Sequence, residues 1–305
     1  MINYIIISLA VVCFAGQFAF TKLYESTVKQ NMISLLVMLI FTSLTGMILY
    51  LCVGKFQVQF STVTLMWAAM LALIMIPYYI VSIYVISLGS LAIYSMFMML
   101  GGMLVPFFYG IVFLDEKITV GKILGTILLS LFIIMQALSA KPKDEVNSAK
   151  SSTKRKYLFL TLCLLIFFIN GLTGVVAKAH QISKGATNEI SFTIISCALT
   201  LILSLILFAF FSLKTRNESK EQILLSVKSK PMCIMFLIGA ATYTGNFLHL
   251  KAASHVPASI QFPLVSGGVI LLSALASAFI FKEKSAAKEW ISIAGAFLST
   301  VLFAF

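Results

Sequence analysis

The sequence predicts an all-α integral membrane protein with ten transmembrane helices, arranged as two inverted five-helix repeats. Three observations predict this fold: an apolar composition, long runs without charge, and a polar linker near mid-chain. Of the 305 residues, 60% are hydrophobic and 10% are charged, and the mean hydropathy is +1.05. Soluble domains carry roughly 25% charged residues, so the composition argues against a soluble domain.

The charge-free runs place the helices. The longest run, residues 56–114, has no Asp, Glu, Lys or Arg over 59 residues, which is enough for two spans of about 20 residues each. Such runs favour helices, because backbone polar groups in lipid must be hydrogen-bonded within the protein. The first run lacks a basic start and a cleavage site, so we interpret it as a retained span. The predicted spans are 4–21, 33–53, 65–87, 90–113, 119–139, 157–178, 189–212, 231–251, 257–281 and 287–305.

The polar, Ser/Lys-rich segment 141–156 separates two halves, 1–140 and 157–305, with five predicted spans in each. We interpret this segment as a flexible cytoplasmic linker. Because five is an odd number, the second half enters the membrane inverted. Inverted repeats are a common design of secondary transporters, with the site at the repeat interface.

Sequence similarity between the halves supports the repeat. The segment LDEK at 114–117 matches FKEK at 281–284, which pairs Glu116 with Glu283. Lys22 and Lys178 each close the first span of a half, and both halves carry a Gly-Gly pair. Chance alignment of apolar segments is the alternative interpretation.

The distribution of basic residues predicts the orientation. The loops after spans 1, 3, 5, 7 and 9 hold 16 of the 22 Lys and Arg, and the other side holds 6. Basic residues accumulate on the cytoplasmic side, so both termini are expected to be extracytoplasmic in a multi-pass plasma (inner) membrane protein. The same pattern accounts for the net charge of +12 without a nucleic-acid partner. A reporter fused after Phe305 that reads as cytoplasmic would overturn this orientation.

The arrangement resembles the drug/metabolite transporter superfamily, specifically its EamA-like members, over nearly the whole chain. In the first half, Pro106 precedes Glu116 by ten residues, and Gly121 and Gly125 follow; the second half keeps Glu283 and Gly295 but has Ser273 at the proline position. The resemblance implies two EamA-like repeats, 1–140 and 157–305. It also implies a central cavity lined by the first, third and fourth helices of each half. The predicted orientation differs from the cytoplasmic termini expected for many members.

Polar side chains within the spans are the candidate substrate-binding residues, because burying a polar group without a partner is unfavourable. For the tyrosine-rich segment 78–103, the alternative is ordinary packing, with the tyrosines in an interfacial belt. The candidate residues are Gln17, Tyr78, Tyr79, Tyr94, Asn170, Tyr243, Asn246, His249 and Gln261.

Several of these features have two interpretations. His249, the only ionisable side chain well inside a predicted span, is either a proton relay or a neutral hydrogen-bonding residue. Glu116 and Glu283 are either proton-coupling groups or carboxylates that stabilise the start of the next helix. The Gly-Gly pairs at 101–102 and 267–268 are either close helix contacts or hinges.

The sequence contains no P-loop and no GxSxG, HExxH or CxxCH motif, so we expect neither an enzyme nor a cofactor. The five cysteines lack metal spacing, and no metal is expected. We predict a secondary carrier, a monomer or homodimer in contact with lipid. It would move a small metabolite such as an amino acid, an amine or a sugar-like solute, with export favoured by the resemblance. The alternatives are proton-coupled uptake and a non-transporting receptor or assembly partner.

Overall fold

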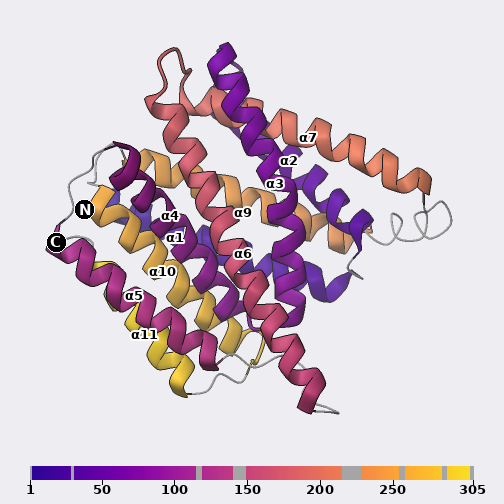
Figure 1. Ribbon diagram of the computed structural model, residues 1–305. Helices are drawn as coiled ribbons and strands as arrows, with labels where there is room; N and C mark the ends of the chain where they lie inside the picture. The colour runs from indigo at the N-terminus through magenta and orange to yellow at the C-terminus, as the bar shows by residue number, and fades with distance from the viewer. Residues whose placement is uncertain are drawn as a thin grey trace.

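The computed structural model is a bundle of long helices (Figure 1). It describes residues 2–28, 31–114, 119–139, 149–214, 228–253, 258–283 and 287–302, and no strand occurs within these ranges. The helices are α1 (Ile2–Thr27), α2 (Met32–Val53), α3 (Thr62–Leu88), α4 (Leu91–Leu114), α5 (Val120–Ser139), α6 (Ala149–Ile182), α7 (Glu189–Lys214), α9 (Ser229–Ala253), α10 (Ala258–Phe279) and α11 (Ala287–Leu302).

Each of the ten predicted spans overlaps one of these helices. The linker prediction was too long, since α6 begins at Ala149 and residues 149–156 are helical. This segment contains alanine, lysine and arginine, which are good helix formers, and its polarity obscured that tendency. The rest of the predicted linker, 141–148, lies outside the described residues.

Seven helices, namely α1, α2, α3, α4, α6, α7 and α9, are long and apolar enough to cross a membrane. The helices α5 and α10 add shorter apolar stretches, Val120–Phe132 and Leu264–Phe279. Large apolar side chains also face outward, including Leu73 at 62% exposure and Ile206 at 59%. Exposed apolar surface on this scale marks contact with a membrane or a partner, and the fold fits a multi-pass membrane protein.

The main helix contacts join the two halves of the chain. From the first half, α1 packs against α9 and α10; from the second half, α6 packs against α3 and α4. Three further contacts are α2 with α7, α4 with α10, and α5 with α11. Figure 1 shows α5 and α11 side by side along one edge of the bundle.

The contact between α4 and α6 is a close backbone approach at Gly101 and Gly171. A Cβ atom on Gly101 would lie 2.0 Å from the carbonyl oxygen of Phe167, and one on Gly171 would lie 2.3 Å from Cβ of Val105. Neither position can hold a side chain without moving a helix. The prediction that Gly101-Gly102 is a close helix contact is confirmed.

The turns gather at two opposite ends of the bundle. We call the end at which α1 ends and α2 begins, together with the turns 89–90 and 280–283, the α1–α2 end. The turns 54–61 and 183–188 lie at the other end, which we call the α2–α3 end.

Candidate functional site

The second half of α3 carries two adjacent buried tyrosines, Tyr78 and Tyr79, directly after Pro77. A proline within a helix removes one backbone hydrogen bond and crowds the carbonyl four residues earlier. The helix is therefore locally weakened where its tyrosines enter the core. The rings of Tyr78 and Tyr79 meet edge to face, with centroids 5.3 Å apart.

Side chains from two other helices, α1 and α4, surround Tyr78. Its hydroxyl donates to the sulfur of Met98 on α4 at 3.4 Å, and the side chains of Gln17 on α1 and Tyr94 on α4 lie beside it. Tyr94 in turn packs edge to face against Phe18, with ring centroids 5.6 Å apart. We call the group Gln17, Tyr78, Tyr79, Tyr94 and Met98 the tyrosine cluster; all five side chains are less than a tenth exposed.

The second half of the chain contributes Tyr243, on α9, next to this cluster. Its hydroxyl is close enough to those of Tyr79 and Tyr50 for electrostatic interaction, and its ring lies edge-on to Tyr50 at 6.1 Å. A Cβ atom on Gly46 would lie 2.3 Å from the same ring. Glycine at position 46 therefore gives the Tyr243 ring its space.

Asn170, on α6, contacts the backbone of the cluster residue Met98. Its Nδ2 donates to the carbonyl oxygen of Met98 at 2.7 Å, so this side chain ties α6 to α4. The structure therefore brings together six of the nine predicted site residues: Gln17, Tyr78, Tyr79, Tyr94, Asn170 and Tyr243.

The remaining three predicted residues lie apart from this group or outside what is described. Asn246 and His249 are partly buried on α9, and the imidazole of His249 lies edge-on to Phe14 with centroids 6.3 Å apart. Gln261 belongs to α10, and its side chain lies outside the described residues. Glu116 also lies outside them.

A buried ion pair joins Lys22 of α1 to Glu283, in the turn between α10 and α11. Ser277 also donates to the carboxylate of Glu283, and the hydroxyl of Ser90 and the backbone N–H of Leu91 donate to Oε2 at 3.3 Å each. The ammonium of Lys22 stands 4.7 Å from the centroid of the Phe281 ring.

The interpretation of Glu283 as a carboxylate that stabilises the start of α11 therefore misses its main interaction. The acidic residue in the first turn of α11 is Glu289. The side chain of Lys22 is only 6% exposed, and a buried charge requires a partner. This requirement, together with the lysines and glutamates that recur in the two halves, could have indicated the ion pair from the sequence.

The α2–α3 end is held by neutral groups around His180, which sequence reasoning did not select. Nε2 of His180 is hydrogen-bonded to Oγ1 of Thr64 at 3.1 Å, and Thr64 also bonds the hydroxyl and the backbone N–H of Thr187 at 3.0 and 2.9 Å. The imidazole stacks on Phe192 at 4.1 Å. Trp67 donates to Ser183 at 3.0 Å.

The structure also corrects the statement that His249 is the only ionisable side chain well inside a span. The predicted sixth span ended at residue 178, whereas α6 continues to Ile182 and buries His180 to 1% exposure.

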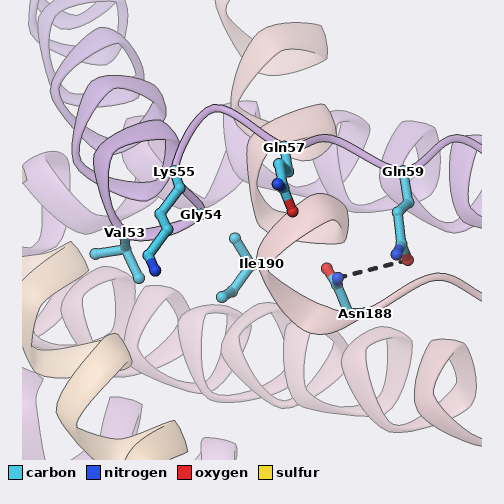
Figure 2. A pocket seen from close by; sticks show the side chains of 7 residues that line it. All are labelled: Val53, Gly54, Lys55, Gln57, Gln59, Asn188 and Ile190. Carbon is cyan, nitrogen blue, oxygen red and sulfur yellow. Dashed lines mark hydrogen bonds between the residues drawn. The ribbon is translucent and has the colours of Figure 1, made fainter.

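A surface cavity of about 250 Å³ lies beside this group, between the α2–α3 and α6–α7 turns (Figure 2). Figure 2 shows Asn188 pointing toward Gln59, to which it donates at 3.5 Å. The cavity is lined by Val53, Gly54, Lys55, Gln57, Gln59, Asn188 and Ile190. The amides and Lys55 make this a polar hollow at the end of the bundle.

Comparison with known proteins adds a likeness of fold. No family model and no curated protein matches the chain. A solved structure described as "Crystal structure of protein" is similar, with a TM-score of 0.56 and 16% identity over 97% of this chain and 95% of that chain.

Proposed function

We propose that this protein is a secondary carrier, which moves a small metabolite across a membrane by alternating access between two inverted halves. The observation that carries the proposal is the tyrosine cluster. Its hydrogen-bonding and aromatic side chains are buried where helices from both halves of the chain meet, and binding sites of carriers lie at such interfaces.

Helix packing supports the inverted repeat. If α1 corresponds to α6, α3 to α9 and α4 to α10, then the contacts of α1 with α9 and α10 match those of α6 with α3 and α4. Three further contacts, α2 with α7, α4 with α10 and α5 with α11, each join a helix to its counterpart. This pattern is what a two-fold relation between the halves would produce.

The chemistry of the cluster favours an uncharged or weakly charged solute. Gln17 and the tyrosine hydroxyls offer hydrogen bonds, and the rings offer apolar contact, as in sites that orient a small ligand by a few polar groups. An amino acid, an amine or a sugar-like compound fits this description. The resemblance to EamA-like transporters favours export, which is an argument by analogy.

Flux into proteoliposomes tests the proposal. Labelled metabolites, selected by a thermal-shift screen of the purified protein, are offered with and without a pH gradient. We expect time-dependent accumulation of at least one class, reduced by Tyr78→Phe and Tyr94→Phe. Tyr84→Phe is the matched control, because Tyr84 lies on the same helix as Tyr78 and is 49% exposed. Binding without flux would contradict the proposal and favour a receptor.

Proton coupling is a variant of the same proposal. If His249 relays protons, His249→Ala abolishes the pH dependence of flux. A pH dependence that survives this substitution assigns His249 to packing against Phe14.

A further inference from the structure

The carboxylate of Glu283 gathers groups from four places in the chain. Lys22 comes from the end of α1, Ser90 from the turn before α4, Leu91 from the first residue of α4, and Ser277 from α10. The first three belong to the first half of the chain. Glu283 and Ser277 belong to the second half, so the pair joins the halves at the α1–α2 end.

The ion pair also lies directly beyond the tyrosine cluster. Lys22 follows Phe18 by one helical turn on α1, and Ser90 precedes Tyr94 by one turn on α4. Because Phe18 and Tyr94 pack against each other, the ion pair stands one turn further toward the α1–α2 end. The ion pair therefore lies between the tyrosine cluster and this end of the bundle.

The low solvent exposure of the two side chains strengthens the ion pair. Lys22 and Glu283 have side-chain exposures of 6% and 17%, so water screens their attraction only weakly. Separation of the halves would break the ion pair together with the hydrogen bonds that Ser90 and Leu91 donate to Glu283. The same contacts favour the closed arrangement only while both charges are present.

We propose that Lys22 and Glu283 form a latch that holds the α1–α2 end closed, and that this end opens when the pair separates. This inference rests on the proposed carrier function. The latch thereby controls whether the tyrosine cluster can be reached from the α1–α2 face.

Thiol accessibility tests the latch without any known substrate. The reporter is Ser82→Cys, in a protein whose five native cysteines are replaced by alanine. Ser82 lies on α3 beside Tyr94 and is 3% exposed. A membrane-impermeant maleimide is applied to proteoliposomes from each face in turn, and cleavage of a C-terminal tag reports the orientation.

In Glu283→Gln and Lys22→Met, we expect labelling from the α1–α2 face to rise about tenfold. That change corresponds to about 1.4 kcal/mol in the equilibrium between closed and open forms. The exchanged pair Lys22→Glu with Glu283→Lys should return labelling toward the starting rate. The matched control is Lys282→Met, because Lys282 is an exposed charge in the same turn as Glu283.

Folded single variants that label within twofold of the parent from both faces would overturn the latch. If the single variants do not fold, the double variant Lys22→Met with Glu283→Met, which leaves no uncompensated charge, takes their place with the same two outcomes. Flux measured in parallel separates the proposals: flux with unchanged accessibility rejects the latch alone. Altered accessibility without flux for any metabolite class keeps the latch and rejects the carrier.

Discussion

The two ends of the bundle are closed by different chemistry. At the α1–α2 end, Lys22 and Glu283 form a charged pair, and three further groups donate hydrogen bonds to its carboxylate. At the α2–α3 end, His180, Thr64 and Thr187 form a neutral hydrogen-bonded group, with Trp67 and Ser183 alongside. Both sets of contacts join the first half of the chain to the second.

The two ends should therefore differ in how strongly a single substitution destabilises them. A buried ion pair depends on both charges, and the loss of one leaves the other unfavourably buried. A neutral group distributes its stabilisation over several hydrogen bonds, each contributing about 0.5–1.5 kcal/mol. We therefore expect a single substitution to cause a large loss of stability at the α1–α2 end and a smaller loss at the α2–α3 end.

The largest effect is expected for Glu283→Gln. Because Lys22 is buried and loses its carboxylate, the free energy of unfolding should fall by about 3–5 kcal/mol. Lys22→Met should be milder, since Glu283 keeps its donors on Ser277, Ser90 and Leu91. Thermal unfolding in detergent measures both variants. The double variant Lys22→Met with Glu283→Gln should recover most of the loss, and additive losses would contradict the coupling of the pair.

The next largest effect is expected for His180→Ala at the α2–α3 end. The substitution removes the stack on Phe192 and the hydrogen bond to Thr64, so we expect a loss of about 3 kcal/mol in the same unfolding assay. His180→Phe separates the two contributions, because it keeps a ring beside Phe192 and removes the hydrogen bond. A loss as large as that of His180→Ala would show that the stack contributes nothing.

Thr64→Val should have an intermediate effect. The backbone N–H of Thr187 and Nε2 of His180 lose their partner, whereas the shape of the side chain is kept. We expect a loss of about 2 kcal/mol, read from the shift of the unfolding midpoint. Thr64→Ser keeps the hydroxyl and serves as the control. If Thr64→Ser and Thr64→Val are equally destabilised, the hydroxyl is not the cause.

The smallest effect is expected for Trp67→Phe, which removes one hydrogen bond to Ser183 and keeps most of the apolar ring. The loss should be about 1 kcal/mol. Ser183→Ala removes the same bond from the other side. The two losses should not add in the double variant, and additive losses would mean that the bond contributes little.

The sequence by itself determined the helices. The absence of charge over 59 residues and the similar runs elsewhere predicted the approximate positions of the helices, because backbone groups in lipid must be hydrogen-bonded within the protein. The sequence also selected Tyr78, Tyr79 and Tyr94, which the structure groups with Gln17 around Met98.

Only the tertiary structure decided which of these groups meet. Lys22 and Glu283 are 261 positions apart, and no local pattern connects them; the packing of α1 against α10 does. His180 was missed because the extent of α6 depends on contacts with Thr64 and Phe192, rather than on its own composition. The helices follow from local apolar composition, whereas the contacts at the two ends follow from the packing of helices that are distant in the chain.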